Sequence, residues 1–203
     1  MNNIEKYEKK PYLYDLYRWT GKVDLKIFLK WRFRPKYKIV YLLRKCQLNR
    51  KKNKLFFLWY RLWYEHYMTV YGVDIGAKAE IGPGFIIRHL GGIAINSGAK
   101  IGKDVEILQG VTIGFERRGK RMGNPTIGDR VWIGSHAAIV GNVKIGNDVL
   151  IAPGAYVNFD VPDNSIVLGN PGKIIKKDNA VEEYVINILD IEKKDIFNNK
   201  HCH

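Results

Sequence analysis

The sequence has little of what marks secreted, disulfide-linked or membrane-spanning proteins. Only two of its 203 residues are cysteines, Cys46 and Cys202, and they lie far apart, so a disulfide framework is not expected. The longest apolar run, residues 55–64, is broken by Arg61 and is shorter than the ~18 residues of a membrane span. The start of the chain has no apolar core and no small-residue cleavage site, so no secretory signal is predicted and the cytoplasm is the expected location.

Positive charge is concentrated in one part of the chain. Residues 1–70 contain 18 Lys and Arg against 5 Asp and Glu, whereas residues 71–203 contain 16 against 15. We therefore predict a basic aromatic segment over 1–70 and a nearly neutral remainder, which consists of a body over 71–177 and a tail over 178–203. No nucleic-acid-binding motif accompanies the charge, so nucleic acid is not an expected partner.

The body repeats with a period of six residues. Many of the repeated aliphatic residues are followed by Gly, which a helix would disfavour by ~1 kcal/mol each relative to Ala. A solenoid explains the pattern, with one short strand per repeat, the aliphatic side chain inward and Gly, Asn or Asp at the corners. The repeated positions are Ile75, Ile81, Ile87 and Ile93, then after a two-residue shift Ile95, Ile101, Ile107 and Ile113, and finally Ile127, Ile133, Ile139, Ile145, Ile151 and Val157.

The repeat is interrupted once, between Ile113 and Ile127, which are fourteen residues apart instead of six. About eight residues of the segment 114–126 must therefore leave the solenoid as a loop. Insertions of this kind often carry the function of a solenoid. The loop contains Arg117, Arg118, Lys120 and Arg121, and the alternative is a tolerated surface insertion.

Five motifs stand out in the body: residues 71–75 (YGVDI), 81–84 (IGPG), 89–92 (HLGG), 107–114 (ILQGVTIG) and 169–173 (GNPGK). In these motifs the body resembles the serine acetyltransferase family of hexapeptide-repeat acyltransferases, and its layout is closest to the O-acetyltransferases of capsule and exopolysaccharide clusters. The resemblance implies a left-handed parallel β-helix, a homotrimer or a pair of trimers, and acetyl-CoA bound in a groove between neighbouring prisms.

Acetyl transfer to a hydroxyl needs a base, and histidine is suited to that role near neutral pH. The chain has five histidines, of which His66 lies among aromatic residues and two lie on the tail. His89 occupies the place of the base in the related family, and Asp74, fifteen residues earlier, has the interval of its carboxylate partner. The resemblance therefore predicts His89 as the catalytic base and Asp74 as the residue that orients it. His136 has no assigned role.

Two departures from the family pattern indicate a different acceptor. Arg88 replaces an acidic residue before the catalytic histidine, and Gly123 and Asn124 replace an Arg-His pair before Pro125. Arg88 and Asn124 supply hydrogen-bond donors that suit a polyol. We expect an acetyl-CoA-dependent O-acetyltransferase that acts on a carbohydrate hydroxyl; the alternatives are serine O-acetyltransferase and a β-helical scaffold without catalysis.

The CoA site is expected along one edge of the prism, where small residues let the pantetheine arm approach the backbone and lysines meet the phosphates. No metal is expected, because the closely spaced histidine pair of the γ-class carbonic anhydrases is missing, and His201, Cys202 and His203 read as incidental. The expected CoA-binding residues are Gly114, Gly134, Ser135, Ala137, Gly154, Ala155, Lys173 and Lys176, with Lys177 as a further candidate.

Residues 1–70 are predicted to form several helices, since apolar residues recur at helical spacing in 13–17 and 55–62. Aromatic residues interleaved with cations are typical of helices at a membrane surface. The alternative is a helical cap that packs on the prism and on its trimer mates. A further amphipathic helix is expected over 181–191.

Overall fold

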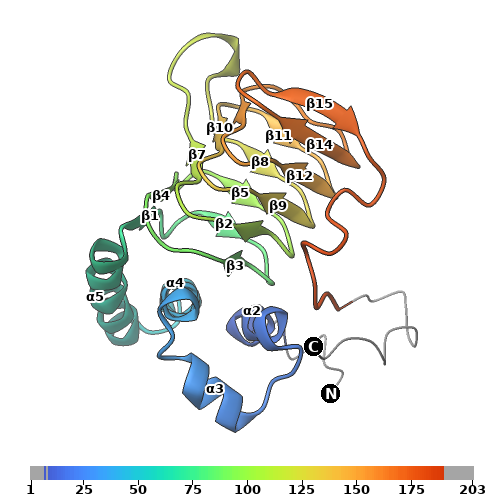
Figure 1. The fold of residues 1–203 in the computed structure, drawn as a ribbon. Coiled ribbons are helices and arrows are strands. Elements are labelled where there is room, and N and C mark those ends of the chain that lie inside the picture. Colours follow the sequence, from blue (N-terminus) through green and yellow to red (C-terminus); the bar gives the residue numbers. More distant parts are fainter. Residues whose placement is uncertain (1–6, 8, 190–203) are drawn as a thin grey trace.

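The computed structural model describes residues 7 and 9–189, which include an α-helical part followed by a β-solenoid (Figure 1). Asp24 and Asn53 begin two of the helices, because their side chains accept the N–H groups of Ile27 and Phe56. None of the described helices has both the length and the apolar composition needed to cross a membrane. The helices are α2 (Pro11–Thr20), α3 (Leu25–Trp31), α4 (Pro35–Asn49) and α5 (Lys54–Tyr71).

Short strands build the coils of the solenoid, and equivalent strands of successive coils pair in parallel in three sheets. Sheet A contains β1 (Val73–Ile75), β4 (Ile93–Ile95), β7 (Thr112–Gly114), β10 (Ala138–Val140) and β13 (Tyr156–Val157). Sheet B contains β2 (Glu80–Ile81), β5 (Lys100–Ile101), β8 (Thr126–Ile127) and β11 (Lys144–Ile145). Sheet C contains β3 (Ile86–Ile87), β6 (Glu106–Ile107), β9 (Val131–Ile133), β12 (Val149–Ile151), β14 (Ser165–Leu168) and β15 (Lys173–Lys176), the last of which pairs antiparallel with β14.

The repeated aliphatic residues form the core, as the period of six predicts. In sheet A, Ile75, Ile95, Ile113 and Ile139 are aligned in register from coil to coil, and each is at most 3% exposed. Burial of such a column supplies the main favourable free energy of a solenoid, since each coil packs only on its neighbours. The expected fold class is therefore confirmed for the body, and the change of composition near residue 70 coincides with the passage from α5 to β1.

Helices α2 and α4 cover the first coil of the solenoid (Figure 1). Arg44 of α4 is 2% exposed; it donates hydrogen bonds to the carbonyl oxygens of Ile81 and Gly82 and pairs with Asp15 of α2 at 2.9 Å. Asp15 in turn accepts the backbone N–H groups of residues 84–85. Buried backbone groups at a strand edge need partners, and here side chains of the helices provide them in place of another coil.

The expected helix over 181–191 is wrong for the part that the structure describes. Residues 178–189 form turns, in which Asn179, Glu183 and Asn187 have φ angles of 54°, 68° and 55°. Left-handed residues every four positions interrupt a right-handed helix. The apolar residues of this segment nevertheless pack, because Val181 and Val185 are buried against sheet C. Residues 190 and 191 lie outside the described part of the chain.

The predicted loop over 114–126 leaves the solenoid between β7 and β8. Glu116 and Gly123 form an antiparallel bridge, and a short 3₁₀ turn, η1 (Gly119–Arg121), lies at its tip. Arg121 forms an ion pair with Asp160 of the last coil at 3.3 Å. Figure 1 shows the loop projecting from the prism at the end remote from the helices.

Candidate active site

His89 lies on a corner of the solenoid that is longer than its counterparts. Eight residues separate Ile87 of sheet C from Ile95 of sheet A, whereas the equivalent residues of the following coils are six apart. The corner contains Gly91 and Gly92, whose φ angles of 101° and 65° lie in the region that favours glycine. His89 is exposed there, so its imidazole is accessible to a ligand that approaches the corner.

Asp74 lies in the middle of β1, with an exposed side chain between two buried neighbours. The His89 corner is held against the start of this strand, since Gly92 N–H donates to the Gly72 carbonyl oxygen at 2.7 Å. Asp74 and His89 are both described, and no hydrogen bond or ion pair joins them. The structure thus places the two on neighbouring elements of the first coil, and their action as a dyad stays a prediction.

Arg88 is engaged within the chain. Its guanidinium donates two hydrogen bonds to Glu106 at 2.7 and 2.8 Å, and it lies over the ring of Trp19 at 4.8 Å. Glu106 is 2% exposed and also lies 3.7 Å from Arg18. A paired and stacked guanidinium has few donors left for an acceptor molecule. Sequence reasoning did not identify Glu106 as the partner of Arg88. The only sequence signal for this contact is the position of Glu106 one coil above Arg88 on the same sheet.

Asn124 lies at the other edge of sheet A from His89. It follows the loop and packs against Gly98, where an added Cβ would be 2.3 Å from the Asn124 Nδ2 atom. Its Oδ1 atom is buried and has no hydrogen-bond partner. Within one chain, Arg88 and Asn124 therefore do not meet.

The His89 corner continues along the solenoid as a column of residues with left-handed backbone. Gly92, Gly110, His136 and Gly154 have φ angles of 65°, 72°, 57° and 69°. An added Cβ at Gly110 would be 2.2 Å from the His136 ring, so this imidazole covers the backbone of the coil below. Gln109, on the same column, has a buried Oε1 atom without a hydrogen-bond partner, and sequence reasoning assigned it no role.

The expected CoA-binding residues separate into two groups on this column. Ser135 is half-buried and Gly154 is exposed, so both border the corner, and the backbone of Gly134 lies beside them. Ala137 and Ala155, in contrast, are 0% and 1% exposed. Their methyl groups belong to the core, so only the backbone of these two residues can border a groove.

The remaining CoA candidates lie in different places. Lys173 is opposite Leu168 in the β14–β15 pair, at the end of the strand that leads to the His89 column. Lys176 is opposite Ser165 at the other end, where its Nζ atom donates to the Asp163 carbonyl oxygen at 2.9 Å, and Lys177 follows it. Gly114 ends β7 at the loop edge of sheet A. The structure thus brings Lys173 to the column and leaves Lys176, Lys177 and Gly114 away from it.

The loop cations border a hollow of their own. A cavity of about 360 Å³ lies between the loop and sheet A, and Arg118, Lys120 and Arg121 line it together with Tyr156. Arg117 is exposed at the base of the loop. The cavity lies over the last coils, whereas His89 lies on the first, so the loop does not cover His89 within the same chain.

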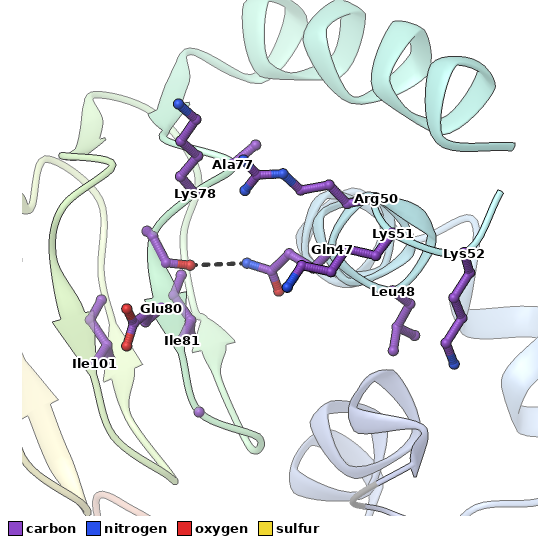
Figure 2. A pocket seen from close by; sticks show the side chains of 12 residues that line it. Gln47, Leu48, Arg50, Lys51, Lys52, Ala77, Lys78, Glu80, Ile81 and Ile101 are labelled. Carbon is purple, nitrogen blue, oxygen red and sulfur yellow. Dashed lines mark hydrogen bonds between the residues drawn. The ribbon is translucent and has the colours of Figure 1, made fainter. Parts of the chain in front are cut away.

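A larger hollow lies elsewhere, between α4 and the first coil (Figure 2). It has a volume of about 760 Å³ and contains neither His89 nor Asp74. Gln47 crosses it and donates to the Ala79 carbonyl oxygen at 3.0 Å. Figure 2 shows Arg50 and Lys78 on its two sides, so it is a basic cleft at the junction of the helices with the solenoid.

Residues 7 and 9–189 contain no group of three His, Cys, Asp or Glu side chains that could hold a metal ion. His201, Cys202 and His203 lie outside the described part of the chain. The site around His89 contains the His89 imidazole as a base, the Asp74 carboxylate, exposed glycine backbone and the unpartnered amide oxygen of Gln109. This set suits proton transfer from a hydroxyl and the binding of an extended molecule along the corner.

Comparison with known proteins agrees with this chemistry. Residues 124–158 match the family described as bacterial transferase hexapeptide (six repeats). The chain is 44% identical over 108 residues to serine acetyltransferase 4 of Arabidopsis thaliana, covering 52% of this chain and 30% of that protein. It is also 44% identical over 106 residues to the serine acetyltransferase of Mycobacterium tuberculosis, covering 51% and 45%. The matched segment thus spans less than half the length of these two relatives.

Solved structures give the same result for the fold. The serine acetyltransferase of Neisseria gonorrhoeae is 28% identical, with a TM-score of 0.68 over 85% of this chain and 68% of that one. The soybean serine acetyltransferase apoenzyme is 27% identical, with a TM-score of 0.67 over 85% and 72%.

These relatives overturn the expectation of a carbohydrate acceptor. Arg88 and Asn124 were expected to be free donors. In the structure Arg88 is paired with Glu106, and Asn124 packs on Gly98. The likeness in layout to the O-acetyltransferases of capsule and exopolysaccharide clusters has no support among the proteins compared. Residues 124–158 of this chain are thus similar to the hexapeptide-repeat transferases, and about half of the chain is similar to serine acetyltransferases.

Proposed function

We propose that this protein is an acetyl-CoA-dependent O-acetyltransferase whose acceptor is serine. The observation that carries the proposal is the exposed His89 on an enlarged, glycine-containing corner, in a domain whose relatives are serine acetyltransferases. His89 is the catalytic base and Asp74 its orienting carboxylate. The Arg88 guanidinium is already hydrogen-bonded to Glu106 and stacked on Trp19. This supports serine as the acceptor, since a free Arg88 donor was the main reason to expect a polyol.

The reaction needs two proton transfers, to and from His89, and one acyl transfer. His89 takes the proton of the serine hydroxyl while the oxygen attacks the carbonyl carbon of the thioester. The C–S bond then breaks, and the CoA sulfur leaves and receives the proton from the imidazolium. General base catalysis of this kind contributes about 10²–10⁴-fold to the rate. A carboxylate beside the imidazole favours its protonated form during the step, which is the role proposed for Asp74.

Acetyl-CoA is proposed to lie along the column of corners that begins at His89. The buried, unpartnered Oε1 atom of Gln109 would accept an amide N–H of the pantetheine arm, and Ser135 and Gly154 border the same path. Lys173, at the far end of the column, suits a phosphate. The residues present therefore fit an extended, amide-containing and anionic co-substrate.

A homotrimer is proposed as the functional unit. His89 is exposed on the first coil, while the loop with Arg118, Lys120 and Arg121 leaves the opposite edge of sheet A and lies over the last coils. One chain alone therefore cannot close its loop over its own base. In a ring of three chains, the loop edge of one prism would lie beside the His89 edge of the next.

The decisive experiment measures release of the CoA thiol from acetyl-CoA with and without L-serine, together with mass spectrometry of the product. We expect serine-dependent turnover at about 1–10³ s⁻¹ and a product heavier than serine by one acetyl group. Binding of acetyl-CoA without serine-dependent turnover would refute serine as the acceptor. Absence of both binding and turnover would favour a scaffold without catalysis.

A further inference from the structure

Helix α5 is apolar on two opposite faces. Its inner face packs on α4 and the first coil, with Tyr64 buried and Phe57, Tyr60 and Tyr67 partly buried against the core. Its outer face is open: the exposed large apolar residues of α5 include Leu55 (80%), Leu58 (52%), Trp59 (58%), Leu62 (67%) and Trp63 (39%). Helices that are apolar all round are normally covered on both faces.

The exposed face extends to the end of α3. Phe33 is 64% exposed and lines a cavity of about 200 Å³ together with Trp59 and Trp63. We call these six residues, Phe33, Leu55, Leu58, Trp59, Leu62 and Trp63, the outer apolar face. Figure 1 shows α5 at the margin of the molecule, with α4 between it and α2, so no other described element covers this face. Exposed apolar patches of this extent mark interaction sites in soluble proteins.

Cations surround the outer apolar face, and acidic residues are almost absent. Arg32 and Lys38 line the same small cavity as the aromatic residues, and the segment 50–54 adds Arg50, Lys51, Lys52 and Lys54 at the start of α5. Glu65 is the only acidic residue between positions 25 and 71, and it already pairs with Arg61. The surroundings of the face are therefore strongly positive.

The charge decides which partner suits this face. A second copy of the same face would bring six or more cations against an equal number, which is unfavourable at the short distances of a protein interface. An acidic surface, in contrast, can interact favourably with both the cations and the apolar residues of this face. Helices that lie on anionic bilayers typically insert aromatic and aliphatic side chains into the membrane interface. Their Lys and Arg side chains contact the negative headgroups.

We propose that the outer apolar face binds the surface of a bilayer that contains anionic phospholipids. Trp59, Leu62 and their neighbours enter the boundary between headgroups and acyl chains, and the cations of segment 50–54 and of α3–α4 contact the headgroups. The long lysine and arginine stems reach outward from the helices while their charges stay in the headgroup layer. The solenoid and its His89 corner remain outside the lipid.

Vesicle flotation of the purified full chain tests the proposal independently of catalysis. We expect binding to vesicles of phosphatidylcholine with about 30 mol% phosphatidylglycerol, weak binding to phosphatidylcholine alone, and loss of binding as salt is raised. Trp59→Ser with Leu62→Ser should lower the partition coefficient about tenfold or more. The control pair, Leu168→Ser with Ile175→Ser, removes two exposed apolar residues from the other end of the molecule and should change little.

A second variant tests the charges. Lys51→Gln, Lys52→Gln and Lys54→Gln together should lower partition into the anionic vesicles about a hundredfold, at about tenfold or less per charge. Lys103→Gln, Lys144→Gln and Lys177→Gln give the same net charge from exposed sites on the solenoid and serve as the control. Equal loss in both triple variants would reduce the effect to net charge and overturn the proposal. An absence of flotation at low salt would also overturn the proposal. The same holds if light scattering shows that the Trp59→Ser, Leu62→Ser variant, and not the control variants, dissociates an oligomer.

Discussion

Arg88 donates two hydrogen bonds to Glu106, at 2.7 and 2.8 Å, across two successive coils of the solenoid. Glu106 is buried and also lies near the fully buried Arg18 of α2. This ion pair ties the residue before His89 both to the next coil and to the helical part. It makes the position of the candidate base depend on contacts remote in sequence.

The first prediction concerns this pair. Glu106→Gln should lower the free energy of unfolding by about 3 kcal/mol, because it leaves Arg88 without its counter-charge and leaves the buried Arg18 with Asp104 alone. Urea unfolding followed by circular dichroism measures the change. Glu80→Gln is the matched control, since Glu80 and its partner Lys100 are exposed and 3.9 Å apart, and it should cost less than about 1 kcal/mol. An equal effect of the two variants would contradict the assignment.

The catalytic base can be tested directly. His89→Ala should lower kcat for serine by about 10²–10⁴-fold, while calorimetry shows acetyl-CoA binding nearly unchanged. Asp74→Asn should lower kcat less, because it removes only the orienting group. His66→Ala, at an exposed histidine of α5, is the control and should leave kcat as it is. Wild-type turnover in the His89→Ala protein would show that another group acts as the base.

Sharing of the site between chains predicts complementation. Deletion of Glu116 to Met122 should raise KM and lower kcat while light scattering still shows a trimer, because strand pairing is untouched. Mixing this deletion with His89→Ala chains and refolding them together should restore about one quarter of the wild-type sites, since a quarter would combine an intact base with a neighbour's intact loop. If the loop acts within its own chain, no site can be restored.

Burial makes Cys46 unreactive. Desolvation raises the pKa of its thiol to about 11, against a partly opposing effect of Arg61. In a Cys202→Ser protein, a thiol reagent at pH 8 should therefore react far more slowly with native than with denatured chain, since about one thiol in a thousand is ionised. The unfolded thiol ionises first, from its ordinary pKa of 9.0, so stability should fall between pH 9 and pH 11. Rapid native labelling at pH 8 would contradict this.

The sequence predicts the solenoid well because its period follows directly from the geometry of the coil. Ile75, Ile95, Ile113 and the rest of the column lie where the repeat puts them, and the position of the loop follows from the one gap in the repeat. Partners across coils cannot be read in the same way. Glu106 is eighteen residues from Arg88, and nothing local indicates that their side chains meet.

Two errors have the same origin. The spacing of Val181 and Val185 suits a helix, but it also suits turns that place both residues inward, and the left-handed backbone at Asn179 and Glu183 selects the turns. The carbohydrate acceptor was inferred from the identity of two side chains without knowledge of what they contact. In both cases the residues show the expected local pattern, but tertiary contacts determine the conformation and the interactions that they adopt.

The helical cap has a consequence for assembly. A parallel solenoid exposes a strand edge at each end, and such an edge can template the addition of another chain. Here Arg44 and Asp15 occupy the polar groups of the first coil, while β15 pairs antiparallel with β14 of the last coil. In polymer terms both ends carry a terminator. A chain that lost α2 and α4 would have an active growing end, and fibre formation would compete with folding.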